Sequence, residues 1–318
     1  MLYNDNHMET PKLTKKHLKI LQNSQLDIQN ADSIDSLLEN KNNIITDVSF
    51  SETTNVEYIK LRKHISYSEI STWMDCAYRH KLKYLDEIKT DKDGPSVHTE
   101  FGQAIHDALE IYITTRVMPP ISQVQDQILE LFKVLPDFDK IKMSDWLDVV
   151  EPILSEVPEY MENVFGKDWE FVAAEYPLME QIDKHEHMFK GFIDGVIKGT
   201  NKKGEKQIVF IDWKSCGYFW PLAKRTDPKK TMQLAFYKYF YCKKYNIPLK
   251  DTKCGFFLLR RSKKTGNCEW VVVSVGEKAV EKALGTIDNM LGYIQKRMFP
   301  KDRSSCTYCQ FSGTEHCK

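Results

Sequence analysis

The sequence lacks the features that would place the chain in a membrane or send it out of the cell. It has no stretch of about 18 or more uncharged apolar residues, so no helix is expected to span a bilayer. Its first residues contain no apolar segment of the signal-peptide kind. We therefore expect a cytoplasmic protein, either of a bacterium or of the host cytoplasm if a phage encodes it, with its cysteines reduced.

The sequence also lacks an excess of charge of either sign. Its 45 Lys and Arg residues are balanced by 45 Asp and Glu residues. A positive field over the whole molecule is thereby excluded, so any nucleic-acid site has to be a local basic groove. A phosphate-binding loop is missing too, because residues 199–206 lack the closing Gly-Lys-Ser/Thr and are expected to form a hairpin turn.

What the sequence does contain is apolar residues at helical spacing, followed by apolar residues that alternate with polar ones. Residues 1–60 are polar and are expected to form either a loosely ordered tail or a small helical cap. Helical patterns follow, starting at the capping box Ser66-x-x-Glu69 and ending, after interruptions at prolines, near residue 165. Alternating patterns then predict strands. The predicted helices are 66–85, 101–117, 231–245 and 277–297, and the predicted strands are 169–179, 188–197, 207–215, 254–261 and 268–275.

This order of elements predicts an α/β fold. We expect a mixed central sheet of about five strands, flanked by helices, behind a helical N-terminal part. Three regions are predicted: the polar tail over 1–60, a main domain over 61–300 and a cysteine-rich segment over 301–318.

Two carboxylates interrupt apolar strands. Asp194 follows Gly191-Phe-Ile, and Asp212 stands within a very apolar run, two residues before Lys214. A carboxylate in a buried strand is costly unless it is paired or binds a metal. Residues two apart on a strand share a face, so Asp212 and Lys214 are expected to point the same way. The set suits a hard divalent cation, although a short Asp-x-Lys is more often a solvated pair on an edge strand.

Further motifs stand around this pair in a fixed order, and together they resemble the RecB-like branch of the PD-(D/E)XK nucleases. The resemblance covers about residues 64–318 and implies a restriction-endonuclease-like core. The chain departs from the family pattern at Ala77, which follows Cys76 at a position where the family has proline. The matching elements are Ser66-x-Ser68, Cys76, Gly102-x-x-x-His106, Glu175, Gly191-Phe-Ile-Asp194, Asp212-Trp-Lys214 and Gln233-x-x-x-Tyr237.

The resemblance implies a role for each of these positions. Asp194, Asp212, the Trp213 carbonyl and His106 would hold Mg²⁺ or Mn²⁺, and Lys214 would be the catalytic lysine. Gln233 and Tyr237, one helical turn apart, would position Lys214 and the DNA backbone. Glu175 is either an accessory acidic group or an ordinary strand residue.

Cysteines form a second cluster at the end of the chain. Cys306-x-x-Cys309 can place two thiolates on one centre, and Cys317 follows. Zinc, with His316 as a further ligand, and an iron–sulfur cluster both fit this pattern. The resemblance to AddB-type and CRISPR spacer-acquisition nucleases implies a [4Fe–4S] cluster held by Cys76, Cys306, Cys309 and Cys317. The other four cysteines, 216, 242, 254 and 268, are expected in the core.

Taken with the resemblance, these residues predict a metal-dependent DNA exonuclease or end-processing nuclease. Local Lys and Arg clusters stand near aromatic residues, among them Trp213 and Trp220, which suits a single-strand channel and free DNA ends. With no motor of its own, a processive enzyme would need a helicase or recombination partner. The alternatives are a restriction-type endonuclease and a non-catalytic DNA-binding protein on the same fold.

Overall fold

The structure is a computed structural model that describes residues 63–91, 93–201 and 203–318. These residues belong to one compact unit. The predicted N-terminal tail lies outside the described residues. Within the described part, every helix is too short or too polar to traverse a lipid bilayer.

A mixed six-stranded sheet forms the centre, which confirms the predicted α/β fold with one strand more than expected. Its order is β1-β3-β4-β5-β6, with β2 also paired to β3. The pairs β1–β3 and β4–β5 are parallel and the others are antiparallel. The strands are β1 (His64–Ser66), β2 (Glu170–Gln181), β3 (Met188–Thr200), β4 (Lys206–Cys216), β5 (Thr252–Arg260) and β6 (Cys268–Val273).

One edge of β3 has two partners in succession. Met188–Lys190 pair with β1, and residues 195–200 pair with β4. Residues 191–194 lie between these ladders, so β1 and β4 diverge there. The short β1 was not predicted as a strand, because its three residues show too little alternation and its partner lies far away along the chain.

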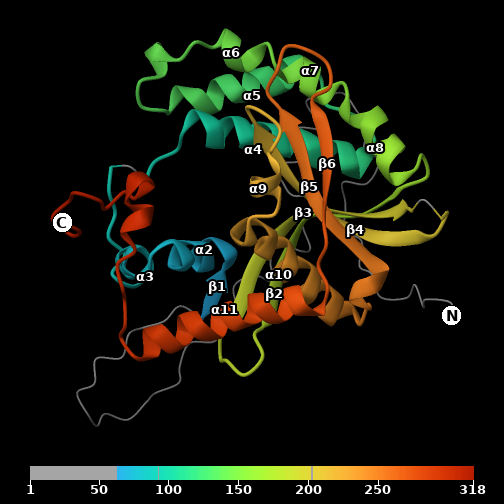
Figure 1. The fold of residues 1–318 in the computed structure, drawn as a ribbon. Helices are drawn as coiled ribbons and strands as arrows, with labels where there is room; N and C mark the ends of the chain where they lie inside the picture. The colour runs from blue at the N-terminus through green and yellow to red at the C-terminus, as the bar shows by residue number, and fades with distance from the viewer. Residues whose placement is uncertain (1–62, 92, 202) are drawn as a thin grey trace, which may run out of the picture. The chain divides into compact units, whose positions relative to one another are not determined.

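Helices cover both faces of the sheet (Figure 1). On one face, α4, α5, α7 and α8 pack over Ile211, Trp213 and Phe257 in one apolar core. On the other, α10 packs its Phe236 and Phe240 against Phe189 of β3. The helices are α4 (Val97–Thr115), α5 (Ile121–Lys133), α6 (Ser144–Leu147), α7 (Val150–Leu154), α8 (Val157–Phe165), α9 (Leu222–Arg225), α10 (Pro228–Tyr245) and α11 (Glu277–Gln295).

The helix predicted over 66–85 is broken at Cys76. Its pieces are α2 (Tyr67–Asp75), α3 (Ala77–His80) and a π-helical turn, Lys81–Leu85. Cys76 is extended at the break, and its sulfur accepts the Arg79 N–H and caps α3. The capping box is half formed: Ser66 accepts the Glu69 N–H, but the Glu69 carboxylate lies 3.1 Å from His80 Nε2 in the interior.

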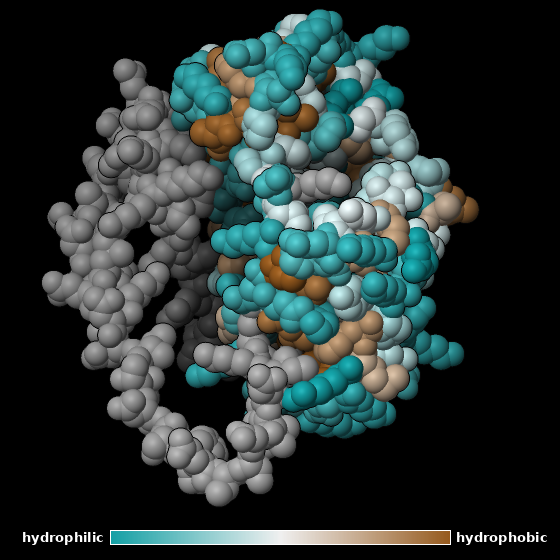
Figure 2. Space-filling view, turned by 90° about the vertical axis from the view of Figure 1, so that its left-hand side faces the viewer, coloured by the Kyte–Doolittle hydropathy of each residue, from teal (hydrophilic) through white to brown (hydrophobic). Residues whose placement is uncertain are grey.

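The C-terminal segment returns to α3. It contains the 3-10 helix Arg303–Tyr308, and Figure 1 shows it in red beside α3. Tyr78 ties the two together, because its N–H donates to the Pro300 carbonyl and its hydroxyl to the His316 carbonyl at 3.2 Å. Figure 2 shows that the described part of the face on this side is mainly hydrophilic, with apolar residues only in small groups.

Candidate active site

The point where β1 and β4 diverge is filled by a carboxylate. Asp194 of β3 accepts the backbone N–H of Trp213 at 2.8 Å, just beyond the last β3–β4 pair, Gly195 with Ile211. The side chain thus takes the place of a ladder hydrogen bond. Asp194 is thereby fixed against β4 while part of its carboxylate stays accessible, with the side chain 14% exposed.

The next residues on β4 supply a second carboxylate and a cation. Asp212 is fully buried, and its Oδ2 lies 2.6 Å from Lys214 Nζ. Its other oxygen, Oδ1, has no hydrogen-bond partner among the described residues. A buried carboxylate oxygen without a donor is costly, and a cation would satisfy it.

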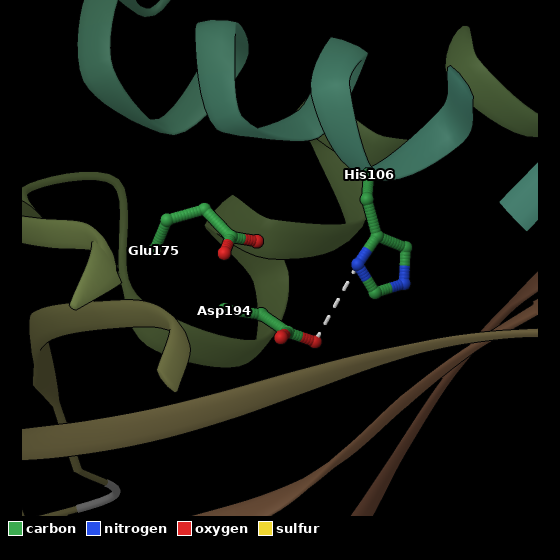
Figure 3. Close-up of side chains that lie close together, drawn as sticks. All are labelled: His106, Glu175 and Asp194. Carbon is green, nitrogen blue, oxygen red and sulfur yellow. Dashed lines mark ion pairs between the residues drawn. The ribbon is translucent and has the colours of Figure 1, made fainter. Parts of the chain in front are cut away.

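His106 approaches from α4 on the other side (Figure 3). Its Nδ1 lies 3.7 Å from Asp194 Oδ2 and its Nε2 lies 2.9 Å from the Trp213 carbonyl oxygen. Glu175 points to the same place from β2, and ligand atoms of His106, Glu175 and Asp194 all lie within 4.8 Å of one another. We call His106, Glu175, Asp194, Asp212 and Lys214 the carboxylate site.

Glu175 occupies a strained backbone position. Its φ is +45°, in the left-handed region, although it stands within a strand. The pairs on either side are Ala174 with Gly195 and Tyr176 with Ile193, so Glu175 lies across from Asp194. A non-glycine residue rarely adopts this conformation, and such strain is concentrated at functional sites.

Burial and neighbouring charges shift the pKa values of these groups. Burial raises the pKa of Asp212 to about 6, although the Lys214 ammonium opposes the shift. Burial also raises the pKa of Asp194. For Lys214, burial alone would lower the pKa, but the charges of Asp212 and Asp194 outweigh it and raise the pKa, so the ammonium stays protonated. Burial and then Lys214 lower the pKa of His106 to about 4, which keeps its imidazole neutral.

Two residues of α10 lie near the site on the other face of the sheet. Gln233 donates to the Tyr237 hydroxyl at 2.9 Å, so these two residues share one face of α10 as predicted. A Cβ at Gly191 would lie 2.9 Å from the Tyr237 ring, so glycine is needed for this approach. Burial, followed by the Asp212 charge, raises the pKa of Tyr237. Neither side chain makes a hydrogen bond to Lys214 among the described residues.

Two further residues near the site were not predicted. Tyr67 starts α2, and burial raises its pKa to about 12 while Lys214 lowers it. Glu110 is buried on α4, one turn after His106, and its charge acts on Asp194. Helical spacing from His106 could have identified Glu110 in the sequence.

The four predicted cysteine ligands line one cavity. Cys76, Cys306, Cys309 and Cys317 border a space of about 290 Å³, which we call the cysteine cavity. Cys76 Sγ also accepts the Asp302 N–H at 3.3 Å, from the segment before Cys306. The close grouping of ligand atoms found at His106, Glu175 and Asp194 is not found for these thiols in the described chain. The other four cysteines are buried, which confirms their prediction as core residues.

The aromatic residues expected near a single-strand channel are placed differently. Trp213 and Trp220 are buried and pack against Phe257 and Phe256. They complete the core and offer no surface to a base. The prediction was wrong for these two residues, because the sequence does not distinguish an aromatic residue that packs inward from one that faces solvent.

Comparison with known proteins identifies the superfamily of this chain. Residues 64–314 match the family described as the PD-(D/E)XK nuclease superfamily, and the chain belongs to this superfamily. A search of curated proteins found no match.

Two solved structures match the chain to different degrees. A "Putative exonuclease" from Eubacterium rectale has a TM-score of 0.51 at 11% identity, over 82% of this chain and 93% of that chain. This likeness shows a shared fold. The protein SSO0001 has a TM-score of 0.36 at 13% identity, over 80% of this chain and 87% of that chain, and no argument rests on it.

Proposed function

We propose that this protein is a divalent-metal-dependent DNA exonuclease or end-processing nuclease. The observation that carries the proposal is the convergence of Asp194, Asp212, Lys214 and His106, from two strands and a helix, at the point where β1 and β4 diverge. The superfamily is one of nucleases, and the matched residues 64–314 include all four of these positions.

The residues present fit Mg²⁺ or Mn²⁺. Asp194 and Asp212 offer carboxylate oxygens, and the Oδ1 atom of Asp212 has no partner in the described chain. The Trp213 carbonyl oxygen and the neutral His106, whose Nε2 lies 2.9 Å from it, would complete the donor set. Glu175 is an accessory acidic ligand in this proposal. When bound, the cation supplies a Lewis acid that polarises the phosphodiester.

The chain's own groups perform the remaining tasks. Hydrolysis adds water across one P–O ester bond, giving a phosphate monoester and a hydroxyl. Lys214 is protonated, so it orients the water and balances the charge that develops on the phosphate. Asp212 holds the ammonium in place at 2.6 Å. Gln233 and Tyr237, hydrogen-bonded to each other on α10, would support the site and contact the DNA backbone.

The cysteine cavity is proposed to hold a [4Fe–4S] cluster, with zinc as the alternative. Support comes from four thiols that border one space and from the Asp302 N–H that points at the Cys76 sulfur. Hydrogen bonds to ligand sulfurs are a usual feature of such centres. The cluster would be structural, holding α3 and the C-terminal segment together. We accordingly propose residues 61–300 as the nuclease domain and 301–318 as its metal clasp.

The proposed substrate is DNA with free ends, single strands preferred. The likeness to a protein described as an exonuclease favours this activity over a restriction-type endonuclease. A helicase or recombination protein is the proposed partner. A non-catalytic DNA-binding role is disfavoured, because binding alone would not require the buried pair of Asp212 and Lys214.

The test compares end-labelled linear DNA with covalently closed circular DNA, in the presence of Mg²⁺ or Mn²⁺. Linear DNA should be degraded and closed circles spared. Lys214→Ala should lower the rate by about two orders of magnitude or more. Discrete cutting of closed circles would support the endonuclease, and full activity of the variant would refute the assignment.

A further inference from the structure

Exposed apolar side chains lie directly beside the carboxylate site, on the hairpin of β2 and β3. Phe192 is 45% exposed and Met179 is 43% exposed, although both stand within strands of the central sheet. Pro177, the direct cross-strand neighbour of Phe192, is exposed as well. Large apolar side chains in a sheet are normally covered, so this patch calls for a partner.

The strand register places this patch next to the proposed metal ligands. Phe192 precedes Asp194 by two residues on the same strand, so their Cα atoms are about 7 Å apart. Gly191 and Phe189 face α10 instead, where they meet Tyr237 and Phe240. Phe192 therefore points away from α10, toward the side from which His106 reaches Asp194.

A cation accompanies the apolar side chains. Lys190 lies across from Met179 and shares the face of Phe192. No carboxylate pairs with its ammonium among the described residues. Going along β3 from Asp194, the surface thus presents an exposed ring and then an unpaired positive charge.

We infer that Phe192 is the base-stacking residue of this site, and that Lys190 contacts the phosphate backbone next to it. The ligand is an unpaired nucleic-acid strand whose scissile phosphate lies at Asp194. An exposed ring beside a cation suits single strands, since each base has a face that can stack. In a duplex those faces are covered by neighbouring bases. This inference deepens the proposed function and rests on it.

Binding without cleavage tests the inference. The full chain carrying Lys214→Ala is titrated, with Mg²⁺ present, against a fluorescein-labelled oligonucleotide that is either single-stranded or annealed as a blunt duplex. When Phe192→Ala is combined with Lys214→Ala, the affinity for the single strand should fall by about 5-fold to 100-fold, the range for one stacked base. The affinity for the duplex should not change. Phe192→Tyr should restore the affinity.

Lys190→Gln should act differently from Phe192→Ala. Loss of one phosphate contact should reduce the slope of log affinity against log salt by about 1, whereas loss of stacking should leave the slope unchanged. Val272→Ala is the matched control, because Val272 is a 55% exposed strand residue on β6, at the opposite edge of the sheet. It should change neither measurement.

The outcomes separate this inference from the proposed function. Unchanged single-strand affinity of Phe192→Ala, or an equal loss for single strands and duplex, would overturn the stacking role even if the wild type cleaves DNA. If single-strand binding depends on Phe192 but the wild type does not cleave DNA, the stacking role is upheld and the proposed nuclease activity is overturned. A folded wild type that binds no oligonucleotide would overturn the inference.

Discussion

Each residue of the carboxylate site is carried by a strand or by the long helix α4, whereas the cysteine cavity is lined by a helix break and a 3-10 turn. Asp212 is fully buried and is paired with Phe256 of β5. The four cysteines of the cavity are all partly exposed. The first site is preorganised by the sheet and α4, and the second brings together two segments that lie far apart in the sequence.

Because of this difference, we expect substitutions in the carboxylate site to change the rate of cleavage and substitutions in the cysteine cavity to change the stability of the fold. Side chains fixed by a sheet keep their positions when a single ligand is replaced, so a change there should affect rate more than folding. A metal that joins distant segments contributes directly to the free energy of folding. Substitutions in the two sites should therefore have opposite signatures.

The largest effect is expected at Asp212. Asp212→Ala removes one proposed metal ligand and leaves Lys214 without its partner, so cleavage of linear DNA should fall below detection. A normal circular dichroism spectrum would show that the fold is kept. Cleavage at the wild-type rate by Asp212→Ala would remove this carboxylate from the mechanism.

A large effect on stability is expected at Cys309. Cys309→Ser should lose the brown colour of anaerobically purified protein and lower the Tm by about 5 to 10 °C, while the cleavage rate at low temperature stays within a few-fold. Cys242→Ser is the control, since its sulfur is buried near Thr252 Oγ1 and outside the cavity. Colourless wild-type protein that carries one equivalent of zinc would show that zinc, and not an iron–sulfur cluster, occupies the cavity. A folded protein free of both metals would refute the metal clasp.

A moderate effect is expected from pH in metal-free protein. Burial raises the pKa of Asp212 to about 6, above the value of about 4 in an unfolded chain. The folded state therefore binds this proton more tightly, and the free energy of unfolding should fall by about 1 to 3 kcal/mol as pH rises from about 4 to about 6. Urea unfolding in EDTA should show a weaker dependence for Asp212→Asn, and parallel curves for variant and wild type would contradict the shift.

The smallest effect is expected where the C-terminal segment meets α3. Tyr78→Phe removes the hydroxyl that donates to the His316 carbonyl and should cost about 0.5 to 1.5 kcal/mol of stability, with no change in cleavage rate. Tyr308→Phe, at a side chain that is 90% exposed, should change nothing. Equal Tm values for Tyr78→Phe and wild type would show that this hydrogen bond does not hold the segment.

Much of the fold could be predicted because its signals are local. The five longer strands and α4, α10 and α11 follow from periodicity, and their ends differ from the predictions by a few residues. What could not be predicted depends on distant contacts. β1 is a strand only because β3 lies beside it, and α2 ends at Cys76 where that side chain turns to cap α3.

The candidate site divides in the same way. Asp194, Asp212, Lys214 and His106 could be found because their spacing matches a known pattern of motifs. The position of Glu175 depends on a left-handed backbone angle that no residue pattern announces. The exposure of Phe192 and the burial of Trp213 depend on which neighbours cover each ring.

The return of the C-terminal segment to α3 also sets an order of events during biosynthesis. Cys76 leaves the ribosome well before Cys306 and Cys317 have been added, by roughly 10 to 50 seconds at ordinary rates of translation. Throughout that interval α2 and α3 can be translated and can pack, but three of the four walls of the cysteine cavity do not yet exist. Loading of the proposed metal would therefore be the final step of assembly, and a nascent chain stalled before residue 306 would carry every residue of the carboxylate site without the segment that contacts Tyr78 of α3.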